Sequence, residues 1–212
     1  DTAITITAIS AEDMEIKQLE NFEDLQFAVP TLTFGKGAYS GSAISLRGIG
    51  NFAVGNASSN SIGYFWNGQS ASQSGLYEAE FFDVERIEVL RGPQGTLFGS
   101  GTTGGAVQML TRRPDVDAGG YFKVDVAEYD STRLSGAFNL PLSDTIRSRF
   151  AFASLKRGGF VTNSYDGNDL DDRNTMSGRM SFEWDYSDNT VISLIYEHTK
   201  ADDNRLRAAR QY

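Results

Sequence analysis

The sequence predicts a mainly β fold, in which a small mixed α/β domain precedes a set of longer antiparallel strands. Its 22 glycines and 12% aromatic residues, against four prolines and one histidine, are typical of tight turns and half-buried strands. No window approaches the roughly 18 consecutive apolar residues that a transmembrane helix needs, so any membrane insertion would use strands. The composition changes after Pro114, which places the predicted domains at residues 1-114 and 115-212.

The composition also excludes several functions. The chain carries 19 basic and 28 acidic residues, a net charge of -9, and no basic stripe, so nucleic acid is not expected as a partner. It has no cysteine and therefore no disulfide or thiolate metal site. His198 is the only histidine and no Ser lies in a G-x-S-x-G motif, so the protein is not expected to be an enzyme. The chain opens at Asp1 without an initiator Met or a signal segment, which predicts a processed or truncated product.

The first domain is expected to begin with a strand and a helix. Thr2 to Ile9 alternates weakly, and Ser10 is a suitable N-cap for a helix from Glu12 to Phe27, since Asp13 follows three residues later. Pro30 ends this helix. Three short strands follow, separated by loops rich in Gly, Ser and Asn: Thr31 to Phe34, Ala43 to Arg47 and Ser61 to Trp66.

The segment from Phe82 to Pro114, FDVERIEVLRGPQGTLFGSGTTGGAVQMLTRRP, is the most informative part of the chain. It combines a charged strand, two glycine-rich turns and a second strand. Four charges lie on the first strand among apolar residues: Glu85, Arg86, Glu88 and Arg91. Because a charge on a partly buried strand is costly without a partner, we expect each of them to be paired.

Gly99, Gly101 and Gly104 match the dinucleotide-binding pattern G-x-G-x-x-G, and Asp125 follows about twenty residues later. The context does not fit this function. Ala106 to Arg112 alternates as a strand, whereas the pattern needs a helix whose N-terminus holds a pyrophosphate. Tight turns between strands account for these glycines.

The second domain is expected to contain five strands near the length of about 9–11 residues that crosses a bilayer. These strands are Gly120 to Glu128, Thr132 to Leu140, Thr145 to Lys156, Asn174 to Tyr186 and Thr190 to Lys200. In the fourth, Met180 and Trp184 oppose Arg179, so one face would meet lipid and the other a polar lumen. The connectors are short except for Arg157 to Arg173. A soluble β-sandwich shows the same alternation, and the pattern alone leaves both folds open.

The segment Phe82 to Pro114 resembles the plug-domain signature of TonB-dependent outer-membrane receptors, a V-E-R-I-E-V-L-R-G-P strand followed by G-T-L-x-G and G-G-A-V turns. Val29-Pro30 and Leu46-Arg47-Gly48 add to the resemblance, while Tyr64 to Gly68 (YFWNG) stands where the family has V-x-V-D-G. The resemblance implies a plug domain inside an incomplete transmembrane β-barrel, of about 22 strands in the full-length protein. The family's energy-coupling box would lie upstream of Thr2.

The resemblance also implies which charges join plug and barrel. In this family, arginines of the I-R-G and L-R-G-P strands pair with glutamates of the barrel wall. The corresponding residues are Arg47 and Arg91, with Glu85, Arg86 and Glu88 as neighbours; we call these five the latch residues. Loss of one partner from a buried pair costs about 3–5 kcal/mol, which suits a latch, although simple docking of two domains would use the same charges.

The family's ligand contacts the plug loops that face outside the cell. Here these loops are Gly35 to Gly41, Gly50 to Asn60 and Ser70 to Tyr77. The candidate substrate-binding residues are Lys36, Tyr39, Phe52, Asn56 and Tyr77.

Asp166, Asn168, Asp169 and Asp171 form an oxygen-rich cluster in the long connector, of a kind that binds Ca²⁺. The spacing is not that of an EF-hand, and a solvated acidic loop is the alternative. The resemblance favours calcium, because cobalamin transporters of this family bind it in the corresponding loop. No other cofactor is expected.

The predicted function is TonB-dependent import of a scarce nutrient, an iron chelate (siderophore), cobalamin or an oligosaccharide, across the outer membrane of a Gram-negative bacterium. The expected partners are TonB and the inner-membrane energising complex, outer-membrane lipid, and a small ligand such as a metal chelate. Two alternatives remain: a structural or interaction component with a static plug, and a soluble β-rich binding module.

Overall fold

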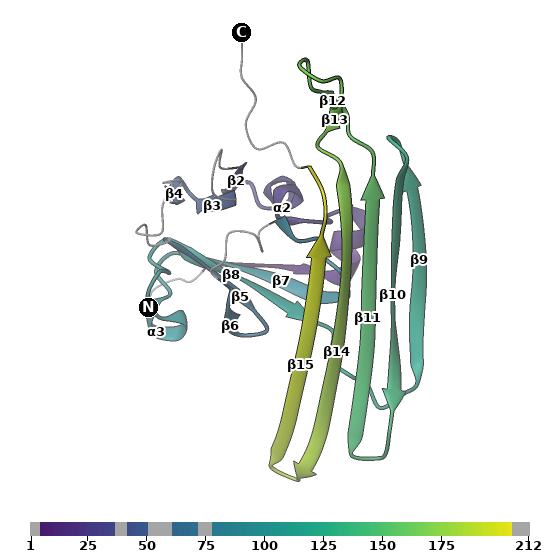
Figure 1. The fold of residues 1–212 in the computed structure, drawn as a ribbon. Coiled ribbons are helices and arrows are strands. Elements are labelled where there is room, and N and C mark those ends of the chain that lie inside the picture. The colour runs from purple at the N-terminus through teal and green to yellow at the C-terminus, as the bar shows by residue number, and fades with distance from the viewer. Residues whose placement is uncertain (1–4, 37–41, 51–60, 72–77, 205–212) are drawn as a thin grey trace. The chain divides into compact units, whose positions relative to one another are not determined.

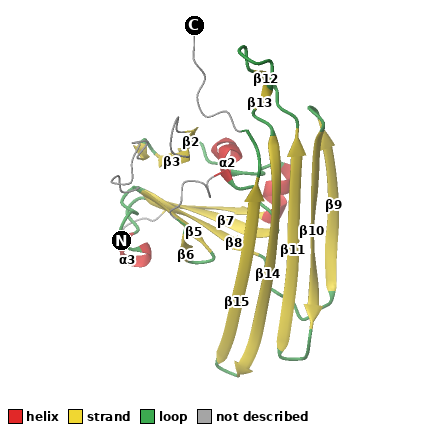
Figure 2. Cartoon of the chain, viewed as in Figure 1, coloured by secondary structure: helices red, strands yellow, loops and turns green. Residues whose placement is uncertain are grey.

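The computed structural model describes residues 5–36, 42–50, 61–71 and 78–204 (Figure 1). They form two compact units, of which the first ends at Arg112 and the second begins at Arg113. Both are built mainly from strands (Figure 2), as the sequence predicts. Among the described residues, no helix has the length and apolar character needed to cross a membrane.

The first unit contains a five-stranded sheet in the order β1-β7-β8-β5-β6 and a three-stranded sheet in the order β2-β3-β4. The strands are β1 Thr5–Ser10, β2 Leu32–Lys36, β3 Ser42–Leu46, β4 Ile49–Gly50, β5 Ile62–Trp66, β6 Gln69–Ser70, β7 Val84–Arg91 and β8 Gly105–Thr111. The helices are α1 Ala11–Ile16, α2 Phe22–Ala28 and α3 Gly95–Phe98. In the larger sheet only the β5–β8 pair is parallel, so the expected mixed α/β domain is present.

The predicted single helix from Glu12 to Phe27 is wrong, because two N-caps divide this region. The Asp13 N–H donates to the Ser10 hydroxyl over 3.1 Å and starts α1. The Asn21 side chain accepts hydrogen bonds from the N–H groups of Glu23 and Asp24 and starts α2. Gln18, between the helices, has a φ of 52°, which no α-helix contains. The hydrogen bond from the Ser10 hydroxyl also lowers the pKa of Asp13.

The β7–β8 pair lies at the centre of the first unit. Ile87, Val89, Val107 and Met109, two from each strand, are fully buried in its main core. Gly105 begins β8 at a φ of +147°, and a Cβ atom placed there would lie 2.4 Å from the Leu90 carbonyl oxygen. A glycine is therefore required where the two strands meet. The first of the predicted glycine-rich turns contains one helical turn, α3, that the sequence did not predict.

The second unit is an antiparallel sheet in the order β15-β14-β11-β10-β9, with a two-stranded hairpin between β11 and β14 (Figure 1). Its strands are β9 Gly119–Ala127, β10 Ser131–Pro141, β11 Ile146–Arg157, β12 Val161–Thr162, β13 Asp169–Leu170, β14 Arg173–Ser187 and β15 Thr190–Ala201. The five long strands match the five predicted ones. The β12–β13 hairpin is a feature of the long connector that the sequence did not predict.

In this sheet the apolar side chains are exposed and the charged ones are buried, the reverse of the arrangement in a soluble protein. Along β14, Met176, Met180 and Trp184 are exposed by 68%, 41% and 43%, whereas the alternating Arg179 and Glu183 are exposed by 2% and 6%. Apolar side chains thus cover the exposed face, which we call the outward face, and polar side chains occupy the other, the inward face. This is the alternation of a transmembrane β-barrel wall, and it removes the β-sandwich alternative.

We predict that Gly105→Ala weakens the β7–β8 pair by about 2 kcal/mol or more, since it combines a strained φ with a clash against the backbone. Hydrogen exchange of the Val89 and Val107 amides in the full-length receptor would measure this as faster exchange. Gly95→Ala is the matched control, because a Cβ atom there meets nothing within 4 Å. Equal exchange in both variants would contradict the steric account.

Candidate functional site

The structure describes little of the predicted ligand-binding surface. Tyr39, Phe52, Asn56 and Tyr77 lie outside the described residues. Lys36 is described only in its backbone, as the last residue of β2, where it pairs with Ser42 of β3. The assignment of these five residues to ligand binding therefore stays a prediction.

Two of the latch residues converge on Thr31, which immediately precedes β2. The Arg47 N–H donates to the Thr31 carbonyl over 2.8 Å, and the Arg91 Nε donates to the Thr31 hydroxyl over 3.0 Å. Arg47 and Gly48, with φ values of 53° and 77°, form the two-residue turn between β3 and β4. Thr31 thus fixes the backbone of one arginine and the guanidinium of the other. Sequence reasoning missed this role because the sequence indicates only that Thr31 begins a strand.

A β-bulge brings the other three latch residues together. The register of β7 against β8 shifts between Val84 and Arg86, so Glu85 and Arg86 meet although neighbouring strand residues normally point to opposite faces. Arg86 donates from Nε to Glu88 over 2.7 Å and also pairs with Glu85. The hydrogen bond to Glu88 raises the pKa of Arg86. These three charges therefore have partners, as the sequence predicts.

The four latch residues of β7 lie on its two opposite faces. Ile87 and Val89 point into the main core, and Arg91 follows them at the same two-residue spacing. Arg86 and Glu88 lie on the other face, which continues into a small apolar cluster around Leu90. The Arg86 side chain keeps 42% of its surface exposed, so its own glutamates leave it accessible to a further partner.

Charged side chains on the inward face of the second unit form a network around Glu183. The Glu183 carboxylate is 2.5 Å from Arg113 Nε and 3.6 Å from Arg147 Nη2. Arg147 also pairs with Asp185 at 2.7 Å. Because Arg113 is the first residue of this unit, the network ties the start of the unit to Glu183 near the end of β14. Sequence reasoning did not find this role for Glu183.

A second pair on the inward face contains a deeply buried arginine. The Arg179 Nε donates to the Glu197 carboxylate over 2.7 Å, and the Arg179 side chain is only 1% exposed. On neighbouring strands, Arg149 Nη1 donates to the Asn139 side chain over 2.9 Å. Arginines on this face are thus held by acceptors on the adjacent strand, the cross-strand arrangement that stabilises a sheet.

The acidic residues of the long connector each contact a different partner and do not converge on one point. Asp171 receives Arg157 at 3.4 Å and Arg173 at 2.9 Å. The Asp166 carboxylate accepts the Asn168 N–H, and Asp169 accepts the Thr162 hydroxyl. No group of three His, Cys, Asp or Glu side chains suited to a metal ion occurs in the part of the chain that the structure describes. The geometry does not favour the calcium site, which stays a prediction.

Comparison with known proteins shows a consistent set of relatives. A family model described as the TonB-dependent receptor plug domain matches residues 1–106. The pesticin receptor of Yersinia enterocolitica is 28% identical over 142 residues, which cover 66% of this chain and 21% of that protein. The ferric enterobactin receptor of Pseudomonas aeruginosa is 33% identical over 99 residues, which cover 44% of this chain and 13% of that protein. The chain therefore spans about a fifth or less of the length of these relatives.

Solved structures show the same fold. The crystal structure of the ferric yersiniabactin uptake receptor from Yersinia pestis superimposes with a TM-score of 0.83 at 23% sequence identity, over 93% of this chain and 32% of that one. The siderophore receptor from Acinetobacter baumannii gives a TM-score of 0.79 at 20% identity, over 95% of this chain and 27% of that one. At these identities the likeness concerns the fold.

We predict that Glu197→Ala lowers the free energy of unfolding of the full-length receptor by about 3 kcal/mol, because it removes the carboxylate that pairs with the buried Arg179 cation. Asp125→Ala is the control, since Asp125 pairs with Lys123 at 3.8 Å and both side chains are more than 40% exposed. Its cost should stay below about 1 kcal/mol. A denaturant titration of both variants tests the difference, and equal losses would rule out a special role for the buried pair.

Proposed function

The chain belongs to the family of TonB-dependent receptors, and from this we propose that the full-length protein imports an iron chelate across the outer membrane of a Gram-negative bacterium. The family is one of transport receptors and not of enzymes. In this proposal the first unit is the plug and the second is the start of the barrel wall. TonB and the inner-membrane energising complex supply the energy.

The observation that carries the membrane part of this proposal is the alternation of the wall strands. Exposed Met, Phe and Trp side chains on one face suit lipid, and the arginine–carboxylate pairs on the other suit a plugged, water-accessible interior. A binding module free in water would expose the opposite face. The wall strands therefore support a membrane-embedded receptor.

The relatives support iron chelates as the cargo. The names of the ferric enterobactin receptor and of the ferric yersiniabactin uptake receptor refer to iron bound by a small chelator. We extend this cargo class to the present protein and place cobalamin and oligosaccharides second. The ligand would contact the plug at Lys36, Tyr39, Phe52, Asn56 and Tyr77.

The latch residues suggest how the plug responds to energy input. Arg47 and Arg91 share Thr31 as an anchor, so a pull on β7 is transmitted directly to the start of β2. Arg86 is half exposed beside two glutamates, which leaves it able to exchange one carboxylate partner for another at low cost. We infer that these groups hold the plug until TonB acts on it.

The proposal is tested by uptake of radioactive iron into cells that carry the full-length gene as their only outer-membrane receptor of this class. Hydroxamate, catecholate and phenolate siderophores are supplied one at a time, beside labelled cobalamin. Uptake of one iron chelate that disappears when tonB is deleted would support the proposal. Cobalamin uptake alone would reassign the cargo, and no uptake with a folded receptor in the membrane would favour a static plug.

We predict that Thr31→Val lowers energised uptake by roughly tenfold while ligand binding is kept, because a hydrogen bond to a charged group contributes about 1.5–3 kcal/mol. The substitution keeps the β-branched shape and removes only the acceptor for Arg91. Thr33→Val in β2 is the matched control, since Thr33 is exposed. An equal fall in uptake in both variants would contradict the prediction, because it would mean that the substitutions disturb strand β2 and not the Thr31 anchor.

A further inference from the structure

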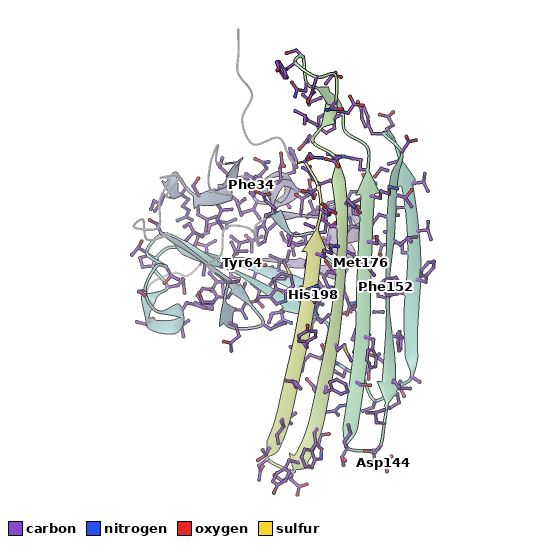
Figure 3. All side chains as sticks on the ribbon, viewed as in Figure 1. Phe34, Tyr64, Asp144, Phe152, Met176 and His198 are labelled. Carbon is purple, nitrogen blue, oxygen red and sulfur yellow. The ribbon has the colours of Figure 1, made fainter. Side chains whose placement is uncertain are left out.

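The connectors at one end of the second unit are joined to one another. They are residues 128–130 between β9 and β10, 158–172 between β11 and β14, and 202–204 after β15. Figure 3 shows the side chains of the β12–β13 hairpin beyond the strand ends, at the end of the sheet opposite Asp144. The connectors at the Asp144 end are short. Because barrels place long loops outside the cell and short turns in the periplasm, we call the three joined connectors the outer rim.

Asp171 lies where the longest of these connectors returns to the wall, between β13 and β14. Its carboxylate is 3.4 Å from Arg157 Nη2 and 2.9 Å from Arg173 Nη1. The Asp171 carbonyl also accepts hydrogen bonds from both guanidinium groups. Arg157 is the last residue of β11 and Arg173 is the first of β14. One residue, only 7% exposed, therefore holds the two wall strands that carry the hairpin.

The backbone around Asp171 extends this link to the residues after β15. The Asp171 N–H donates to the Asn204 carbonyl over 2.8 Å, and the Asn204 N–H donates to the Asp172 carboxylate over 2.6 Å. The Asp202 N–H donates to the Asn174 carbonyl over 2.9 Å. Two successive connectors of the outer rim are thus hydrogen-bonded to each other.

Arg157 extends the link to the turn between β9 and β10. Its guanidinium carbon lies 4.8 Å from the centroid of the Phe160 ring, and the ring centroids of Phe160 and Tyr129 are 5.5 Å apart. The Gly158 N–H donates to the Tyr129 carbonyl over 2.7 Å. A cation over a ring and a pair of rings both favour one arrangement of these side chains. All three connectors of the outer rim are therefore linked through Arg157 and Asp171.

The backbone of Asp171 has a conformation that few residues adopt. Its φ is 64°, in the left-handed region, where Asp and Asn are tolerated better than most other residues. Such a conformation persists only where the surrounding structure fixes it, and residues of this kind gather at functional sites. Here the two arginines and the Asn204 carbonyl provide that surrounding structure.

The hairpin beyond Asp171 is bonded internally and can move only as one piece. The Asn163 N–H donates to the Asn168 carbonyl over 2.8 Å, and the Gly167 N–H donates to the Asn163 carbonyl over 2.8 Å. The Tyr165 N–H donates to the Asn163 side chain over 3.0 Å. The Tyr165 side chain at the tip is 96% exposed. The contacts of Asp171 at the base of the hairpin therefore decide where this exposed aromatic ring lies.

We propose that Asp171 is a positioning residue for capture of the iron chelate, because it holds the outer rim in one arrangement before the chelate arrives. The inference rests on the proposed function for the identity of the cargo. A surface that is ordered in advance avoids the free-energy cost of ordering during binding. If only about one receptor in ten kept the ordered rim, the apparent dissociation constant would rise about tenfold, because only that fraction binds well.

The order of the rim is measured as the distance between spin labels at positions 165 and 202 of the full-length receptor in lipid, without cargo. Asp171→Asn keeps the size of the side chain and its tolerance of the left-handed conformation, and removes the charge. We expect a distance distribution about twice as wide in this variant as in the parent receptor. Asp166→Asn is the matched control, since Asp166 is exposed in the same connector and an amide oxygen can still accept the Asn168 N–H. The control should leave the width unchanged.

The effect on capture is measured by uptake of radioactive iron into cells. The iron is bound in turn to a hydroxamate, a catecholate and a phenolate siderophore, each over a range of concentrations. Asp171→Asn should raise the half-saturating concentration about tenfold and keep the saturating rate, because the plug is unchanged. A loss of folded receptor would instead lower the saturating rate and keep the half-saturating concentration. Arg157→Gln removes the other member of the ion pair and should reproduce both results, so it replaces Asp171→Asn if that variant does not reach the membrane.

Two results would overturn the proposal: distance distributions of unchanged width in Asp171→Asn and Arg157→Gln, or an unchanged half-saturating concentration in a variant whose distribution is broader. A wild-type receptor that imports none of the three iron chelates would refute the proposed cargo. The distance measurement uses no cargo, so in that case it still decides whether Asp171 holds the outer rim.

Discussion

The second unit depends on one constraint: where a wall strand crosses the membrane, its charged side chains must lie on the inward face, because the outward face meets hydrocarbon. Strand β14 shows how this is met. Its outward side chains are exposed Met and Trp, and its inward Arg179 and Glu183 are buried beside Glu197, Arg113 and Arg147. An alternation of period two therefore decides both where lipid lies and where charges can be placed.

The first unit also has to accommodate charged side chains next to a buried core, and it also does so by pairing them. Its strand β7 carries four charges, yet the Ile87 and Val89 side chains of the same strand are fully buried. A bulge gathers Glu85, Arg86 and Glu88 on one face, and Thr31 receives Arg91 on the other. Each charge on this strand therefore has a polar partner within the first unit.

The sequence predicts the strands well because their pattern is long and regular. The five wall strands and β8 lie where alternation places them, and Gly99, Gly101 and Gly104 lie in the connection between α3 and β8, as predicted. The predicted single helix from Glu12 to Phe27 is wrong because Asn21 is as good an N-cap as Ser10. The spacing of apolar residues does not reveal that one helix ends and a second begins between these two caps. Thr31 and the β7 bulge depend on tertiary contacts and register, which a pattern in one strand cannot show. The ligand-binding loops have no periodicity, so their residues rest on resemblance alone.

A spin-label scan of residues 176 to 185 in the full-length receptor, reconstituted in lipid, would show whether β14 forms part of a membrane wall. Accessibility to oxygen and to a water-soluble nickel complex separates lipid from water at each position. We expect the even-numbered positions to contact lipid, and Arg179, Ser181 and Glu183 not to do so. Water access at the even positions, or no alternation at all, would contradict the assignment of this sheet to a membrane wall.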